Sequence, residues 1–124
     1  MAVAVRPASA RDHLGVLRVL DAAMLETDSE TVERRIDADG VFVAVDDDRI
    51  VGALVTLPRE SGVHIDAIAV RRRRRGNGVG SRLVERAAER YGTLTADFDP
   101  EVKPFYESLG FDIEKQGERY RGRR

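Results

Sequence analysis

The segment "IAVRRRRRGNGVGSRLV", residues 68–84, joins an apolar strand to an apolar helix through five arginines and three alternating glycines. A helix start presents unpaired backbone N–H groups and a partial positive charge, and both attract anions. Glycine has no Cβ atom, so the backbone at Gly76, Gly78 and Gly80 can turn sharply and come close to a phosphate. The segment therefore predicts a loop that holds a phosphorylated ligand, with Arg75 adding a charge-assisted contact.

Other interpretations of this segment stay open on its residues alone. The loop lacks the G-K-[ST] ending of a P-loop and the G-x-G-x-x-G spacing of a dinucleotide fold. A glycine-rich turn can also be a plain connection between a strand and a helix. The arginine run, Arg71–Arg75, could bind nucleic acid, but no aromatic side chains interleave with it as stacking platforms.

Length and composition restrict the class of protein. A chain of 124 residues predicts one domain, residues 1–124, and 42% hydrophobic with 35% charged residues indicates a globular protein with a heavily charged surface. The absence of cysteine excludes disulfides and cysteine nucleophiles, and two histidines argue against a zinc site. No apolar run reaches the length of a membrane span and no signal peptide is visible, so we expect a cytoplasmic protein without a membrane partner.

Hydrophobic periodicity predicts a mixed sheet with helices packed on it. The first helix carries Leu14, Leu17, Leu20 and Met24 at helical spacing, after an S-x-x-D start signal at Ser9. Pro104 places the start of the last helix near Lys103 or distorts its first turn. The expected elements are a strand at 3–9, helices at 10–25 and 27–36, a hairpin at 40–57 with a solvated acidic turn at 46–48, a strand at 63–70, a helix at 79–91, a strand at 93–98, a helix within 100–109, and a hairpin at 111–122 that turns at Gly117.

Two blocks in this order resemble the GCN5-related N-acetyltransferases. The acetyl-CoA signature of that family, [QR]-x-x-G-x-[GA], matches residues 75–80, and "PFYESLGF", residues 104–111, matches its aromatic pair before a helix-ending glycine. The resemblance covers nearly the whole chain and is strongest over residues 63–111. It implies an α+β (α/β) fold with a mixed, mostly antiparallel, splayed sheet of six to seven strands and about four helices.

The resemblance implies acetyl-CoA as co-substrate and no metal. The pyrophosphate would rest on the loop amides, and the pantetheine arm would lie along the strand at 63–70 like an added strand, in a gap near a bulge. Phe105 is assigned to the core and also to the cofactor pocket. The implied cofactor-binding residues are Ile68, Ala69, Val70, Arg75, Gly76, Asn77, Gly78, Val79, Gly80 and Phe105. Two roles stay open for the rest of the arginine run. It could be a solvated loop, or one of Arg71, Arg72, Arg73 and Arg74 could contact the 3′-phosphate of coenzyme A.

The resemblance also implies roles in catalysis. The Ile68 N–H would polarise the thioester carbonyl, and Tyr106 would protonate the departing thiolate; a packed aromatic is the simpler role for Tyr106. His64 stands where some relatives place a glutamate that acts as the general base, and Asp66 follows two residues later on the same strand face. The base could be His64, Asp66 or only water, and His64 could be a purely structural histidine.

The expected function is direct acetyl transfer from acetyl-CoA to a primary amine of a small molecule or a protein. The acceptor would enter over the first two helices and the final strands, where Glu26, Asp28, Glu30 and Glu33 favour a cationic amine such as a polyamine, an amino sugar, a lysine side chain or a protein N-terminus. The alternatives are a non-catalytic domain that senses acyl-CoA and, less favoured, a nucleic-acid-binding module. Relatives are often dimers, which leaves a homodimer open.

Overall fold

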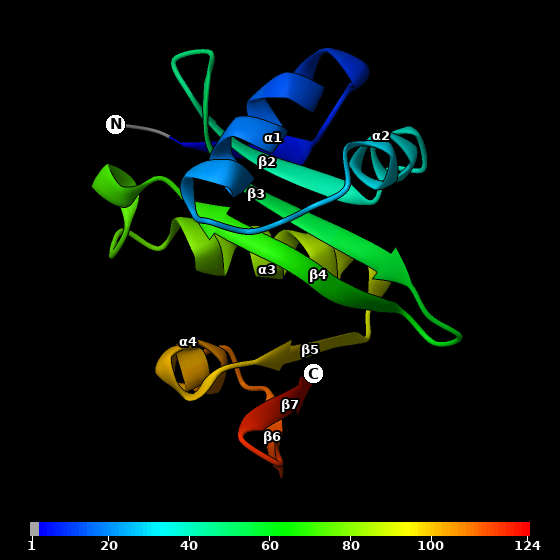
Figure 1. Ribbon diagram of the computed structural model, residues 1–124, viewed down its shortest axis with the longest axis vertical. Coiled ribbons are helices and arrows are strands. Elements are labelled where there is room, and N and C mark those ends of the chain that lie inside the picture. The colour runs from blue at the N-terminus through cyan, green and yellow to red at the C-terminus, as the bar shows by residue number, and fades with distance from the viewer. Residues whose placement is uncertain (1–2) are drawn as a thin grey trace.

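A seven-stranded sheet with helices on both faces forms the framework of the computed structural model, which describes residues 3–124 (Figure 1). The strand order is β1-β2-β3-β4-β5-β7-β6; β4 and β5 run parallel, and the other neighbouring pairs are antiparallel. The elements are β1 (Ala4–Pro7), α1 (His13–Ala22), α2 (Ser29–Asp37), β2 (Val41–Asp46), β3 (Arg49–Pro58), β4 (Val63–Val70), α3 (Val79–Tyr91), β5 (Leu94–Phe98), α4 (Lys103–Ser108), β6 (Asp112–Gln116) and β7 (Arg119–Arg123). The expected fold class is confirmed.

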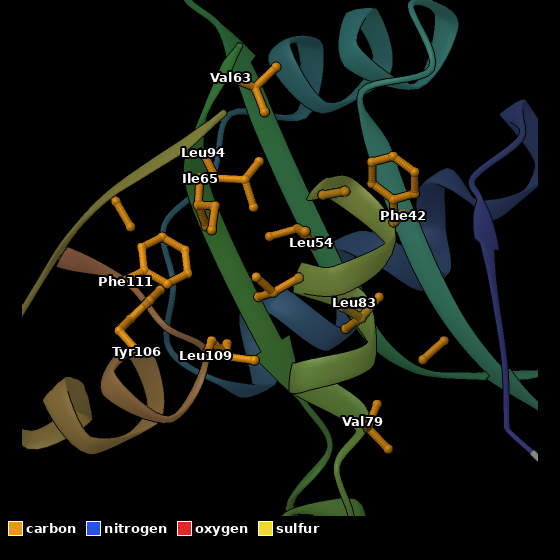
Figure 2. Close-up of a cluster of buried hydrophobic side chains, with 14 of the residues drawn as sticks. Phe42, Leu54, Val63, Ile65, Val79, Leu83, Leu94, Tyr106, Leu109 and Phe111 are labelled. Atoms are coloured by element: carbon orange, nitrogen blue, oxygen red, sulfur yellow. The ribbon is translucent and has the colours of Figure 1, made fainter. Parts of the chain in front are cut away.

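Two apolar clusters lie on opposite faces of the sheet. The cluster under α1 and α2 contains Val16, Val32 and Val43. The cluster under α3 and α4 contains Phe42, Leu83 and Tyr106; Figure 2 shows Phe42 and Leu83 at α3 and Tyr106 beside α4. Among the helices of residues 3–124, none combines the length and the apolarity that a bilayer span requires.

The start of the first helical segment follows the sequence signal. A short 3₁₀ turn, Ala10–Asp12, precedes α1. The Asp12 carboxylate accepts hydrogen bonds from the Ser9 N–H at 2.8 Å and from Arg6 at 2.7 Å. Hydrogen bonding from Arg6 lowers the pKa of Asp12 to about 2. The carboxylate therefore gives a partner to the Ser9 N–H, a backbone donor at the start of the helical segment that has no partner within the helix.

The apolar stripe expected along α1 is wrong at both ends. Val16, Val19 and Leu20 are the buried side chains of α1, whereas Leu14 is exposed. Met24 lies beyond the end of the helix at Ala22, in the left-handed region with a φ of 61°. The spacing 16, 19, 20 is also helical, so periodicity alone could not decide which stripe faces the sheet.

The other expected elements agree with the structure within a few residues. The strand at 63–70 and the helix at 79–91 have the expected bounds, while β1 is shorter than expected. Pro100–Val102 forms a 3₁₀ turn and α4 begins at Lys103, so Pro104 lies in the first helical turn, where it is tolerated. The last hairpin turns at Gly117, which has a φ of 65°.

A bulge in β4 and its short pairing with β5 open the sheet. Val55 is opposite Ala67 and Thr56 is opposite Ile65, so Asp66 is the extra residue on β4. The bulge reverses the alternation of side chains, because Ile65 packs in the α3 cluster whereas Ala67 packs under α1. β5 pairs with β4 only from Val63 to Ile65, so the two strands diverge beyond the bulge.

Candidate active site

The open edge of β4 presents main-chain groups that no strand covers. The Arg71 N–H donates to the Val51 carbonyl of β3 at 2.8 Å. Since main-chain groups alternate between the two sides of an antiparallel strand, those of Ala69 also face β3, and those of Ile68 and Val70 face the gap toward β5. Of the predicted set, Ile68 therefore offers free backbone groups and Val70 a free N–H, because the Val70 carbonyl accepts from Arg75 at 3.1 Å. The structure keeps the main chain of Ala69 out of the gap.

The loop after β4 ends in glycines with left-handed backbone. Gly76 and Gly78 have φ angles of 80° and 79°, and no atom lies within 4 Å of a Cβ placed on either. Gly78 is the N-cap of α3, so the N–H groups of the first turn, which begins at Val79, point outward from it. The glycines thus permit the turn and leave open space above the amides.

Gly80 has a different reason to be glycine. A Cβ at Gly80 would lie 3.2 Å from the ring of Phe105 on α4. The sequence grouped all three glycines as phosphate-facing, whereas Gly80 allows close packing between α3 and α4. Asn77 is exposed in the loop, and the side chain of Val79 is buried in the core beneath it.

The arginine run is divided among different contacts. Arg74 forms an ion pair with Asp46, whose side chain is buried, so the expectation of a solvated turn is wrong for Asp46. Arg71 donates to the Ile50 carbonyl at 3.4 Å, and Arg75 donates to the Val70 carbonyl at 3.1 Å. The remaining members, Arg72 and Arg73, are exposed in the 3₁₀ turn Arg72–Arg74.

Tyr106 lies in an aromatic cluster at the base of the gap. Its ring stacks on Phe98 with centroids 4.2 Å apart and meets Phe105 and Phe111 edge-on at 5.1 Å. Burial raises the pKa of Tyr106 to about 12, so the phenol is protonated at neutral pH. Its hydroxyl has no hydrogen-bond partner within residues 3–124. The oxygen is not fully buried and Tyr106 lines the cavity, so the hydroxyl remains available to a ligand.

His64 connects β4 to β5 where the two strands diverge. Its Nδ1 is hydrogen-bonded to Thr95 Oγ1 at 2.7 Å, and its Nε2 lies 3.7 Å from Asp97 Oδ2. Asp97 also accepts two hydrogen bonds from Arg121. Burial lowers the pKa of His64, and the charge of Arg59 acts in the same direction. Both ring nitrogens of this histidine therefore face β5 groups.

A cavity of about 280 Å³ lies in the gap between β4 and β5. It brings Asp66, Ile68, Phe105 and Tyr106 together, but His64 does not line it. Sequence reasoning missed part of the wall, because these residues come from connections and from β4, β5 and β7 with no motif of their own. The missed lining residues are Leu25, Asp97, Phe98, Asp99, Glu101, Val102 and Arg119, together with Ile65 and Ala67 of β4.

Comparison with known proteins identifies the class. The family model described as the acetyltransferase (GNAT) domain matches residues 37–113. Since this match spans more than half of the chain, the chain belongs to the GNAT family. It carries the acetyltransferase domain that defines this family. No curated protein sequence matches the chain.

Solved structures share the fold at low sequence identity. Ard1 from Thermoplasma volcanium superposes with a TM-score of 0.84 at 19% identity, covering 100% of this chain and 97% of that chain. Arabidopsis thaliana Naa50, in complex with the bisubstrate analogue CoA-Ac-MVNAL, has a TM-score of 0.79 at 19% identity and covers 100% and 99%. The PaiA N-acetyltransferase from Thermoplasma acidophilum, in complex with coenzyme A, has a TM-score of 0.77 at 13% identity and covers 100% and 99%.

Proposed function

We propose that this chain transfers the acetyl group of acetyl-CoA directly to a primary amine bound in the gap between β4 and β5. The observation that carries the proposal is the meeting of three features at one place. They are the free main-chain groups of Ile68 with the free N–H of Val70, the amide loop at 75–80 that follows β4, and the phenol of Tyr106. Each fits a part of acetyl-CoA: the amide-bearing arm, the diphosphate and the thioester.

Acetyl-CoA, when bound, supplies a thioester whose carbonyl carbon is open to attack. The amine nitrogen bonds to that carbon and the carbon–sulfur bond breaks. An ammonium acceptor loses two protons in total: one leaves to water before attack, and the other is balanced by the proton that the thiolate sulfur takes up.

Two groups of this chain face the charge that develops in this reaction. The Ile68 N–H, free of strand pairing, can donate to the carbonyl oxygen as negative charge builds on it. The Tyr106 hydroxyl can donate to the departing sulfur, because its raised pKa keeps it protonated. Both groups act in the sheltered gap, where hydrogen bonds to charge are stronger than in water.

Asp66 is the candidate that holds the acceptor ammonium, and water takes the proton. Asp66 is exposed on the bulge and lines the cavity. His64 is less suited, because Thr95 and Asp97 face its two ring nitrogens. In this proposal His64 is a positioning residue that holds β5 at the divergence point. The acceptor is a cationic amine, of a small molecule or a protein, drawn by the carboxylates of the cavity wall.

The proposal is tested by coenzyme A calorimetry on a matched pair of glycine variants. Gly78 and Gly92 cap opposite ends of α3 with φ angles of 79° and 77°, and no atom lies within 4 Å of a Cβ placed on either. Gly78→Ala should lose about 1 kcal/mol of stability from left-handed backbone, and Gly92→Ala should lose more, because its ψ of −86° lies outside the left-handed helical region. Only Gly78→Ala should weaken coenzyme A binding, by tenfold or more. Equal affinities in the two variants would contradict the loop assignment.

A further inference from the structure

The wall of the cavity combines uncompensated carboxylates with exposed apolar side chains. Four carboxylates line it, from Asp66, Asp97, Asp99 and Glu101, against one arginine, Arg119. Asp97 is paired with Arg121 at 2.8 Å, and Asp99 is paired with Arg119 at 2.9 Å. Within residues 3–124, Asp66 on β4 and Glu101 on the turn before α4 form no ion pair, so their charge is free to meet a ligand.

The apolar part of the wall consists of side chains that a folded protein normally covers. Four large hydrophobic residues of the described chain are exposed: Leu14 at 57%, Met24 at 90%, Leu25 at 36% and Val102 at 44%. Leu25 and Val102 line the same cavity as Asp66 and Glu101. Grouped exposed apolar side chains at a hollow indicate contact with a ligand.

The connection between α1 and α2 places the apolar side chains at this mouth. It crosses in front of β4 in Figure 1, and Leu25 lines the cavity that contains Ile68. Leu25 and Met24 also line a neighbouring hollow of about 920 Å³, whose wall includes the carboxylates of Asp21, Glu26 and Asp28. Leu25 therefore lies on the walls of both hollows, where an acceptor that enters from either can contact it.

We infer that the acceptor is a primary amine that carries an apolar group close to its ammonium. This inference rests on the proposed function and names its substrate class. The ammonium lies against Asp66 and Glu101, and the apolar group lies between Leu25 and Val102. A polyamine would place a second ammonium between Leu25 and Val102, and an amino sugar would place hydroxyls there; neither of these two side chains can accept a hydrogen bond from them.

The test compares thiol release from acetyl-CoA across five acceptors. These are 2-phenylethylamine, isoamylamine, a short peptide with an N-terminal leucine, spermidine and glucosamine. We expect kcat/KM at least tenfold higher for the apolar amines or the leucine peptide than for spermidine and glucosamine. Comparison of the small apolar amines with the leucine peptide shows whether the acceptor is a small molecule or a polypeptide N-terminus. A preference for either supports the inference.

Variants link the preference to the wall. Leu25→Ser and Val102→Ser should each lower kcat/KM for the preferred apolar acceptor by about tenfold, with the KM for acetyl-CoA unchanged. Leu14→Ser is the matched control, because Leu14 is more exposed than Leu25 and lies on α1 outside the cavity wall. An equal loss in Leu14→Ser would overturn the inference.

Two results would contradict the inference and differ in what else they contradict. Release of thiol with spermidine or glucosamine as the best acceptor would overturn the apolar acceptor while the proposed transferase stands. If none of the amines causes thiol release, in a protein that binds acetyl-CoA in calorimetry, both the inference and the proposed transferase are overturned.

Discussion

At the scale of single residues, burial limits what Tyr106 can do in the proposed acetyl transfer. Its pKa of about 12 is well above the value near 8.5 of an ordinary alkyl thiol. Complete proton transfer from this phenol to a free thiolate would cost about 5 kcal/mol. Tyr106 therefore acts best as a hydrogen-bond donor while negative charge develops on sulfur, and the proton reaches the thiol as the phenol is replenished from water.

Removal of the Tyr106 hydroxyl is expected to slow the reaction without loss of the fold. The ring of Tyr106→Phe keeps its stacking on Phe98, so we expect the free energy of unfolding to change by less than about 0.5 kcal/mol. We expect kcat to fall about 10²-fold, with little change in the KM for acetyl-CoA. Steady-state thiol release measures both constants. An unchanged kcat would mean that Tyr106 only packs in the core and takes no part in the reaction.

The same hydroxyl gives an alkaline signature in stability. Its pKa is raised in the folded state, so the unfolded chain loses the proton first as pH rises. The free energy of unfolding is therefore independent of this group below about pH 10 and falls by about 2–3 kcal/mol between pH 10 and pH 12. Urea unfolding of wild type and Tyr106→Phe between pH 9 and 12 tests this, and parallel stability curves would show that the hydroxyl is not buried.

Asp12 has the opposite pH dependence. Its pKa is lowered to about 2 in the folded state, so its stabilising contribution is present above about pH 4 and is lost as pH falls through 2. Arg6 is partly exposed, which weakens the pair, and we expect Asp12→Asn to cost about 1–2 kcal/mol at pH 7. Denaturation at pH 7 and at pH 2.5 measures the difference, which should shrink at the lower pH; a constant difference would exclude the charge as its cause.

Sequence reasoning named the candidate site residues but could not rank them. The motif at 75–80 and the aromatic pair located the loop and Tyr106, because both features are local in sequence. The choice between His64 and Asp66 depends on Thr95, which lies 31 residues from His64 and meets it only through strand pairing. The lining residues Leu25 and Val102 follow from how connections lie over the gap, which no local pattern encodes.

At the scale of elements, the bulge in β4 creates the site and is invisible to pattern reading. The strand "VHIDAIAV" alternates apolar and polar residues up to Asp66 and then continues with four apolar residues. In the structure its two halves bury opposite faces, with Ile65 on the α3 side and Ala67 on the α1 side. Small alanines and larger aliphatics are all apolar, so a change of face leaves no mark in hydropathy. The bounds of β4 could be predicted, but the position of Asp66 at the opening could not.

The contact between α3 and α4 provides a prediction at this scale. A Cβ at Gly80 would lie 3.2 Å from the ring of Phe105, so Gly80→Ala must push α4 slightly away. We expect a loss of about 1–2 kcal/mol in stability, and a several-fold lower kcat because Tyr106 moves with α4.

A double-mutant cycle checks the cause of this loss. Gly80→Ala combined with Phe105→Leu removes part of the ring that the new Cβ meets. The two changes together should therefore cost less than the sum of the single changes. Additive losses would show that the contact with Phe105 is not responsible.

At the scale of the whole molecule, the fold separates charge that the chain order mixes. Residues 1–62 carry 7 basic and 12 acidic side chains, and residues 63–124 carry 14 and 10. The sequence therefore indicated a cationic second half. In space, Arg18 and Arg49 from the first half join Arg71 around one hollow, and Arg49 and Arg71 also line the hollow that holds Arg72 and Arg73. The carboxylates of the acceptor cavity include Asp97 and Glu101 from the second half.

This separation gives the two substrates different approaches. Coenzyme A is a polyanion and is attracted to the arginine side, whereas an ammonium is attracted to the carboxylates in the gap. With a net charge of −1, the molecule has no large overall field, so the local distribution decides the direction of approach. Arg72 and Arg73 are exposed, and in residues 3–124 they form no ion pair, so they supply this field without a structural task.

Neutralising this pair should therefore slow the association of coenzyme A only at low ionic strength. Arg72→Ser with Arg73→Ser should lower kcat/KM for acetyl-CoA about threefold at low salt, and screening should abolish the difference near 0.5 M salt. Arg123→Ser with Arg124→Ser is the matched control: it removes the same charge from exposed positions near Leu94, which pairs with Val63 at the other end of β4. A loss that persists at high salt would instead indicate a direct contact with a phosphate, and equal losses in both pairs would mean that net charge alone is sensed.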